Sequence, residues 1–170
     1  MSVNVLYRTK ASATGGRDGH ARTEDGTLDV NLTIPKELGG NGAPGNNPEK
    51  LFAAGYSACF LGAMKFVATQ GGPKVPDNTS VTGTVGIGPR SEGGFGLDVE
   101  LDISLPGLPR DEAQDLIERA RGSASVAHPA PLVKDEFQML LLHSALGDFE
   151  TTMRRMAGAK CKVNRQNTCA

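Results

Sequence analysis

Residues 46–60 read NNPEKLFAAGYSACF, and this stretch predicts the start of the long helix around which the chain is organised. Asn47 suits the N-cap because its side-chain oxygen can accept a free backbone N–H, and the proline after it suits the first helical position. Glu49 places a negative charge near the positive end of the helix dipole. The helix continues through small and apolar residues as far as the glycines at 71–72, so we expect it to be buried in the middle of a domain.

The composition of the 170-residue chain fits one domain, or one domain with an appendage. The formal net charge is −1, so bulk charge gives no reason to expect a nucleic-acid partner. The three histidines are isolated and the three cysteines lack metal-ligand spacing, so we expect no metal site. The few cysteines and an N-terminus too polar for a secretory signal favour a reducing compartment, and we expect a cytoplasmic protein. Lys50, Ser57 and Lys65 argue against a membrane span for the long helix.

Apolar periodicity predicts an α+β fold with antiparallel sheet. We expect strands at residues 3–10, 27–34, 80–87 and 93–105, the last two joined as a hairpin, and a second helix that opens at residues 108–112. The composition changes at about residue 122, and apolar residues then recur at spacings of 3 and 4, which predicts an amphipathic helix over residues 135–157. We therefore divide the chain into a main domain over residues 1–121 and a divergent tail over residues 122–170, whose last residues, 160–170, form a loose polar end.

Cys59 lies within the long apolar helix, where a cysteine is usually buried and inert. It lies beyond the first turn, so a reactive thiolate there needs a cation from elsewhere in the chain. Arg17, in a loop flanked by glycines, is a candidate for that cation, and a solvated loop arginine is the alternative. Glu49 could hold such an arginine through a bidentate pair, although Glu49 and Cys59 lie ~15 Å apart along an ideal helix and cannot touch directly.

Six collinear stretches carry a resemblance to a known family. They are ATGGRDGH at 13–20, LDV at 28–30, PKELGG at 35–40, NPEKLFAAGYSACF at 47–60, GGFGL at 93–97 and LPGL at 105–108. With these stretches the chain resembles the organic hydroperoxide resistance (Ohr) proteins of the Ohr/OsmC superfamily over roughly residues 1–120. The resemblance implies an intertwined homodimer with antiparallel sheets around a buried central helix.

The resemblance also implies an activity, that of a thiol-dependent peroxidase that reduces organic and lipid hydroperoxides to alcohols. Cys59 matches the peroxidatic cysteine, and Arg17 and Glu49 match the pair that holds and activates it. The family binds no cofactor or metal and takes its electrons from an external dithiol, either dihydrolipoamide or a lipoylated partner protein. Phe52, Tyr56 and Phe60 could receive the apolar tail of the hydroperoxide, and core packing explains each of them equally well.

The chain departs from the family after the second predicted helix, where the resolving cysteine that closes a disulfide with the peroxidatic sulfur is expected. Ala124 or a neighbour stands at that position, and no alternating final strand follows. Three explanations are open: an artefactual tail from a shifted frame or a retained intron, a genuine replacement, or a degenerate relative. Cys161 or Cys169 could act as the resolving residue instead, and nothing in the sequence selects either. Without any resolving thiol, the sulfenic acid at Cys59 is prone to over-oxidation and the peroxidase is impaired.

Two other classes of function stay open at this point. One is a non-catalytic Ohr-like domain that binds hydrophobic ligands or senses peroxide through a single oxidation, which turnover with dihydrolipoamide would distinguish from an enzyme. The other is an inert scaffold that cannot fold stably without its last strand, which cooperative thermal unfolding would exclude.

Overall fold

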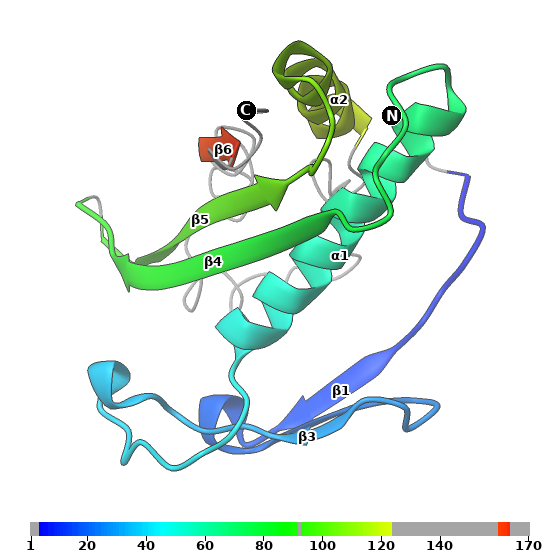
Figure 1. Cartoon of the computed structure of the whole chain (residues 1–170). Helices are drawn as coiled ribbons and strands as arrows, with labels where there is room; N and C mark the ends of the chain where they lie inside the picture. Colours follow the sequence, from blue (N-terminus) through cyan, green and yellow to red (C-terminus); the bar gives the residue numbers. More distant parts are fainter. Residues whose placement is uncertain (1–3, 92, 124–159, 164–170) are drawn as a thin grey trace. The chain divides into compact units, whose positions relative to one another are not determined.

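The computed structural model describes residues 4–91, 93–123 and 160–163. The chain forms two compact units, Met1–Phe52 and Ala53–Ala170, and the long helix begins in the first and continues into the second. The elements in chain order are β1 (Ala11–Thr14), η1 (Gly16–Asp18), β2 (His20–Thr23), β3 (Asp29–Asn31), η2 (Lys36–Leu38), α1 (Pro48–Thr69), β4 (Ser80–Pro89), β5 (Phe95–Ser104), α2 (Arg110–Ser123) and β6 (Lys160–Val163) (Figure 1). This set of helices and strands confirms the predicted α+β class.

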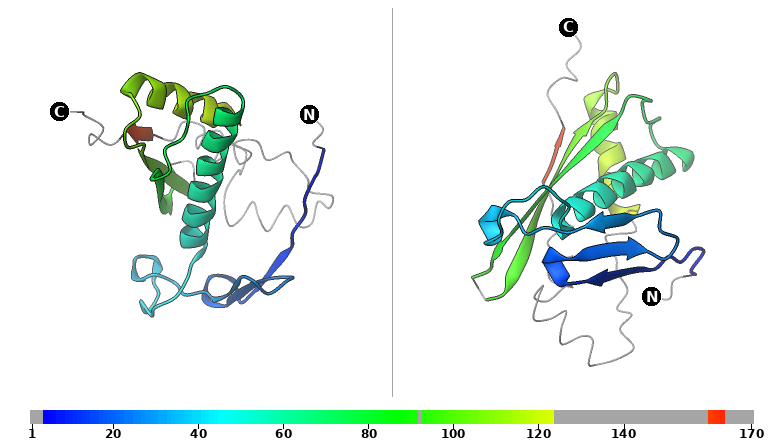
Figure 2. Two further views of the ribbon diagram at one scale, coloured as in Figure 1. Left: turned by 45° about the vertical axis from the view of Figure 1, so that its right-hand side comes forward. Right: turned by 90° about the horizontal axis from the view of Figure 1, so that it is seen from below.

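The first unit contains a three-stranded antiparallel sheet in the order β1-β2-β3 (Figure 2, right). Ala11 pairs with Thr23 and His20 pairs with Asn31, so β2 is the central strand. Just after β3, the N–H of Thr33 donates to the carbonyl of Asn46 over 2.8 Å. This contact ties the loop before α1 to the end of the sheet.

The predicted strand at residues 3–10 is wrong over the residues that the structure describes, because residues 4–10 have no regular secondary structure. The strand begins at Ala11, where β2 provides a partner. Leu6 and Tyr7 are 92% and 79% exposed, so their alternation with polar residues does not reflect a buried face. Alternation predicts an extended chain, whereas a strand also needs a neighbour to bond to.

Two further differences from prediction lie in the same sheet. The strand expected at 27–34 is shorter, with β3 covering Asp29–Asn31 and Leu32 forming a parallel bridge to Asn46. Strand β2, which reads HART, was not predicted because it lacks the apolar alternation that marks a half-buried strand.

The second unit contains the predicted hairpin, which is confirmed. Strands β4 and β5 pair over ten residues each, from Ser80 opposite Ser104 to Pro89 opposite Phe95. Strand β6 adds to the free side of β5 in parallel, so the sheet has the order β4-β5-β6 (Figure 1). The expected loose polar end is therefore wrong for Lys160–Val163, whose four residues are too few to give a periodic signal.

The hydrophobic core of the second unit is built by α1, β5 and α2. Its largest fully buried side chains are Phe60, Met64, Leu101, Ile103, Leu105, Leu116 and Ile117. The second predicted helix, expected to open at residues 108–112, is confirmed as α2, which buries Ala113, Leu116, Ile117 and Ala120. Burying each large apolar side chain stabilises the fold by about 1.5–3 kcal/mol before the cost of ordering the chain.

Helix α1 has the bounds that its sequence predicts, with Asn47 as the cap and Gly71 in a left-handed conformation after its end. Its buried residues within this chain are Phe60, Ala63, Met64 and Val67, all in the second half, and Phe66 is 57% exposed. Among the described residues α1 is long and apolar enough to cross a membrane by length and composition, with a mean hydropathy of 1.5, a test that core helices of soluble proteins also pass. The predicted helix at 135–157 and the positions of Ala124 and Cys169 lie outside the described residues.

Candidate active site

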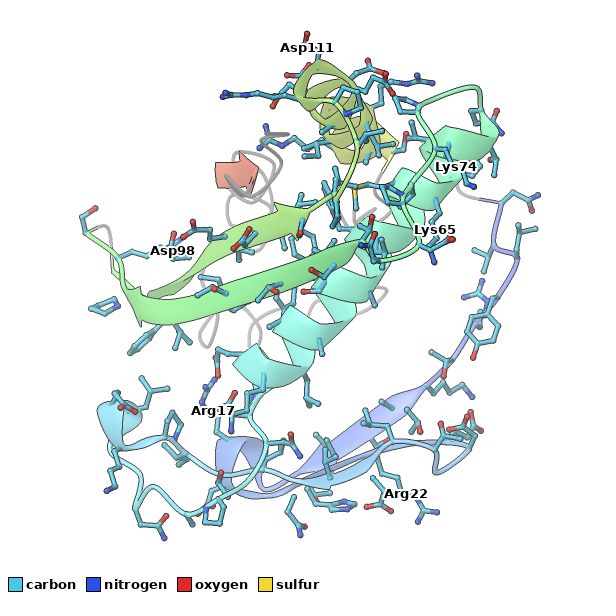
Figure 3. All side chains as sticks on the ribbon, in the orientation of Figure 1. Arg17, Arg22, Lys65, Lys74, Asp98 and Asp111 are labelled. Atoms are coloured by element: carbon cyan, nitrogen blue, oxygen red, sulfur yellow. The ribbon has the colours of Figure 1, made fainter. Side chains whose placement is uncertain are left out.

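Arg17 and Glu49, predicted as partners from residue type, form an ion pair in the first unit. The Nη2 of Arg17 donates to the Oε2 of Glu49 over 2.5 Å. The two side chains are 33% and 12% exposed, so the carboxylate is largely removed from water. Charge-assisted hydrogen bonds of this kind are about twice as strong as neutral ones. Figure 3 shows Arg17 beside the first turn of α1, which carries Glu49.

Glycines on both sides of Arg17 make its position possible. Gly15 has a φ of 70°, a left-handed conformation that side chains rarely tolerate, and it begins the short helix η1. At Gly19 an added Cβ would lie 1.9 Å from the carbonyl oxygen of Thr14, so no larger residue fits there. The chain thus enters and leaves η1 through a tight loop that presents Arg17.

One buried N–H donor of the Arg17 guanidinium lacks a hydrogen-bond partner in the described part of the chain. Its Nε is buried and has no hydrogen-bond partner within residues 4–91, 93–123 and 160–163. Buried donors are almost always hydrogen-bonded in proteins, and an exception calls for a reason such as a ligand or a catalytic role. This donor is a feature that sequence reasoning did not identify, since only the folded loop buries it.

The first turn of α1 holds Glu49 in place. The predicted cap is confirmed, because the N–H of Lys50 donates to the Oδ1 of Asn47 over 2.8 Å. The Nζ of Lys50 also donates to the carbonyl of Gly45 over 2.8 Å. A fixed first turn gives the Glu49 carboxylate a defined direction and keeps it at the positive end of the helix dipole.

Cys59 lies half-buried on α1 in the second unit. One side of the helix carries four residues at spacings of 3, 4 and 3, namely Glu49, Phe52, Tyr56 and Cys59. From the first to the last of them, the direction of the side chain around the helix axis turns by about 80°. Phe60 lies on a different side and is 1% exposed in the core, which is a packing role. The use of Phe52 and Tyr56 as a substrate pocket stays a prediction.

Strand β4 approaches α1 closely at Ser57, which precedes Cys59 by two residues. A Cβ added to Gly83 would lie 2.7 Å from the Oγ of Ser57 and 3.1 Å from the carbonyl oxygen of Ala53. The same Ser57 hydroxyl donates to that carbonyl over 2.7 Å. The glycine within this strand therefore marks a close approach of the backbone of β4 to the helix.

Residues 39–129 of the chain match the family described as OsmC-like protein. An organic hydroperoxide resistance protein of Xanthomonas axonopodis pv. citri is 53% identical over 116 residues, which cover 68% of this chain and 81% of that protein.

Two solved structures of organic hydroperoxide resistance proteins are similar in fold as well as in sequence. The one from Legionella pneumophila is 42% identical with a TM-score of 0.66, covering 72% of this chain and 88% of its own. The one from Elizabethkingia anophelis is 48% identical with a TM-score of 0.66, covering 72% of this chain and 86% of its own.

Proposed function

This chain belongs to the organic hydroperoxide resistance proteins of the OsmC-like family, and on that premise we propose that it is a thiol-dependent peroxidase that uses Cys59 to reduce organic and lipid hydroperoxides to alcohols. A role in hydroperoxide resistance under oxidative stress follows from the family. The observation that supports the finer proposal is the partly buried Arg17–Glu49 pair, in which the buried Nε–H of Arg17 has no partner among the described residues.

The chemistry follows from the residues present. The thiolate of Cys59 attacks the terminal oxygen of the hydroperoxide, the O–O bond breaks, and the alkoxide takes up a proton and leaves as the alcohol. Cys59 is left as a sulfenic acid. Arg17 stabilises the negative charge that develops on the departing oxygen, and Glu49 orients the guanidinium. Phe52 and Tyr56, on the same side of α1 as Cys59, receive the apolar tail of the substrate.

The proposal extends to the reductant and the assembly. An external dithiol, dihydrolipoamide or a lipoylated partner protein, returns Cys59 to the thiol, and the protein itself holds no cofactor or metal. The working form is a cytoplasmic homodimer in which a second copy covers the apolar surface of α1. The exposure of Phe66 and the small number of α1 residues buried within one chain support this assembly.

Peroxide consumption tests the proposed activity. We expect the purified protein to consume cumene hydroperoxide over many turnovers with dihydrolipoamide as reductant, and the Cys59→Ser variant to fall to the background rate, because serine cannot form a sulfenic acid. The Cys169→Ser variant is the matched control for replacing a cysteine. A Cys59→Ser protein that consumes the hydroperoxide as fast as the parent would refute the proposed role of Cys59.

A peroxide sensor is the second candidate, and it is favoured by Ala124 or a neighbour standing where the family resemblance implies a resolving cysteine. A sensor would undergo one stoichiometric oxidation at Cys59 and then stop, even with excess dihydrolipoamide. Counting the moles of hydroperoxide consumed per mole of protein therefore separates the two candidates.

A further inference from the structure

We propose that Gly45, in the loop before α1, is a positioning residue for the peroxidase reaction. It lets the chain ahead of α1 pack directly against the residues that follow β3, and this contact fixes the place of Glu49 relative to Arg17. The inference rests on the proposed function for its effect on rate, which is an effect on the hydroperoxide step. The contacts that carry it all lie within the first unit.

The segment just after β3 is bonded to the loop that carries Arg17. The N–H of Leu32 donates to the carbonyl of Gly19 over 2.7 Å, two residues after Arg17. Beside it, His20 pairs with Asn31 in the ladder between β2 and β3. Leu32 is 6% exposed and is the only buried apolar residue that the structure describes in the first unit. The loop of Arg17 is thus fixed to a segment that is itself held away from water.

The same segment is bonded on its other side to the chain that leads into α1. The N–H of Asn46 donates to the carbonyl of Asn31 over 3.2 Å, and the N–H of Thr33 donates to the carbonyl of Asn46 over 2.8 Å. The segment therefore lies between the two others as a middle strand lies between its neighbours. Asn46 precedes Glu49 by three residues, so a shift of Asn46 is passed to the first turn of α1.

Gly45 permits these bonds because it has no side chain. A Cβ added there would lie 2.5 Å from the Cγ2 and 2.6 Å from the Oγ1 of Thr33. Threonine is branched at Cβ and its χ1 rotation is restricted, so this neighbour has little freedom to turn away. Gly45 does not have a positive φ, so a larger residue is excluded by space and not by the backbone conformation.

The ion pair that this contact holds depends on fine geometry. The Nη2 of Arg17 and the Oε2 of Glu49 lie 2.5 Å apart, and such hydrogen bonds extend to about 3.2 Å. A methyl group at position 45 needs about 1 Å more room to reach an ordinary contact distance from Thr33. A shift of that size takes the carboxylate out of bonding range, and a misplacement of about 1 Å in an active site can cost about 10²-fold in rate.

Four proteins test the assignment: the parent, Gly45→Ala, Thr33→Ala and the double variant. Steady-state kinetics with cumene hydroperoxide and dihydrolipoamide gives kcat/KM for each substrate. We expect Gly45→Ala to lower kcat/KM for the hydroperoxide by about 10-fold and that for dihydrolipoamide by less than about twofold, because the proposed role of Arg17 lies in the hydroperoxide step. Thr33→Ala should match the parent. The double variant should recover most of the loss, because both colliding atoms of Thr33 are gone.

A second comparison separates positioning from a general loss of structure. In the Arg17→Ala background, Gly45→Ala should have no further effect on kcat/KM for the hydroperoxide, because the residue through which it acts is already absent. Circular dichroism checks that each variant unfolds cooperatively. If Gly45→Ala does not, the double variant Thr33→Ser, Gly45→Ala takes its place, because serine lacks the Cγ2 and its hydroxyl can adopt another rotamer.

Urea unfolding gives a readout that needs no activity. A double-mutant cycle of Arg17→Ala and Glu49→Gln measures how strongly the two side chains stabilise each other. This coupling should be present in the parent, lost in Gly45→Ala and restored when Thr33→Ala is added.

The outcomes separate this inference from the function on which it rests. An unchanged coupling in Gly45→Ala, parent kinetics in that variant, or equal losses of kcat/KM for the two substrates would each overturn the role of Gly45 and leave the peroxidase proposal standing. A parent protein without turnover would overturn the peroxidase proposal, and the unfolding cycle would then decide whether Gly45 holds Glu49 on Arg17.

Discussion

Glycine at position 19 allows the loop around Arg17 to close. A side chain there would collide with the carbonyl of Thr14, 1.9 Å from the added Cβ, and the arginine would be carried away from Glu49. The residue types of the pair can be predicted from sequence, because a loop arginine and a first-turn acid suit a charge-assisted bond. Their contact could not be derived from spacing, since the two residues are 32 positions apart in the sequence, with strands β2 and β3 between them.

Removing the guanidinium should impair catalysis and leave the fold intact. We expect Arg17→Ala to lower kcat/KM for cumene hydroperoxide by about 10²-fold, the usual effect of losing one donor that stabilises developing charge. Arg17→Lys should recover only part of the loss, because an ammonium cannot form the planar fork. Steady-state kinetics with dihydrolipoamide measures both.

The matched control for Arg17 is Arg22→Ala in β2, whose side chain is 61% exposed and pairs with Asp29 at 3.4 Å. Surface pairs of this kind contribute little, so kcat/KM should stay within about twofold of the parent. Equal losses in the two variants would contradict a specific role for Arg17.

Gly83 is the second position where a single added Cβ atom would disturb the packing, here that of β4 against α1. We expect Gly83→Ala to destabilise the protein by about 1–3 kcal/mol, because the new methyl group would overlap Ser57 and force β4 away from α1. Gly88→Ala on the same strand is the control, since no atom of the described residues, its chain neighbours aside, lies within 4 Å of its Cβ position. Urea unfolding followed by circular dichroism measures the difference, and equal midpoints for the two variants would be the contrary result.

Among the elements, those that carry their own start and stop signals could be predicted. Helix α1 has its cap and terminal glycines, and the β4–β5 hairpin has two alternating strands around a Gly-Gly turn. Strands β1, β2 and β6 have four paired residues each and no distinct pattern, because they are too short to show a period and the neighbouring strand supplies the stabilisation. Tertiary pairing overrides local propensity in such strands.

The turn between β2 and β3 contains Asp25, a carboxyl group with a lowered pKa. A hydrogen bond from the side chain of Thr23, followed by those from the backbone and side chain of Thr27, holds the pKa of Asp25 below the ordinary value for an aspartate. A lowered pKa in the folded state means that these bonds stabilise the turn above the unfolded-state pKa. That contribution is lost as the pH falls through the lower, folded-state pKa.

We therefore expect Thr23→Val to raise the pKa of Asp25 toward the ordinary value, and Thr27→Val to raise it less, because Thr27 keeps its backbone donor. Carboxyl chemical shifts followed by NMR over an acid titration give both values. A parent Asp25 that titrates at or above the ordinary value, or the opposite order of the two variants, would argue against these bonds.

At the scale of the whole molecule, the main feature is the apolar surface that a single chain leaves exposed to solvent. Leu6, Tyr7 and Phe66 are all more than half exposed, and α1 is mainly apolar along its 22 residues. The sequence predicts an apolar helix in the interior, and in one chain burial is confined to the second half of that helix. The proposed second copy would account for both observations, because the interior of a dimer forms only on association.

A single charge on this surface should weaken the dimer. We expect light scattering after size exclusion to give twice the chain mass of 17.8 kDa for the parent. Phe66→Asp should shift it toward the monomer at micromolar concentration, because burying an unpaired carboxylate is costly. Gln70→Asp, a polar position just beyond the same helix, is the control and should stay dimeric. A parent protein that runs as a monomer would count against the proposed assembly.

Helix α1 joins the two compact units as one continuous element, with Glu49 near its start and Cys59 ten residues later. The acid and the thiol therefore keep a fixed helical phase, set by the number of residues between them. One inserted residue would rotate Cys59 by about 100° relative to Glu49 and move it about 1.5 Å along the axis. An insertion or deletion anywhere between these two residues should consequently be harmful even at positions where a substitution is harmless, a constraint that applies to the backbone rather than to any side chain.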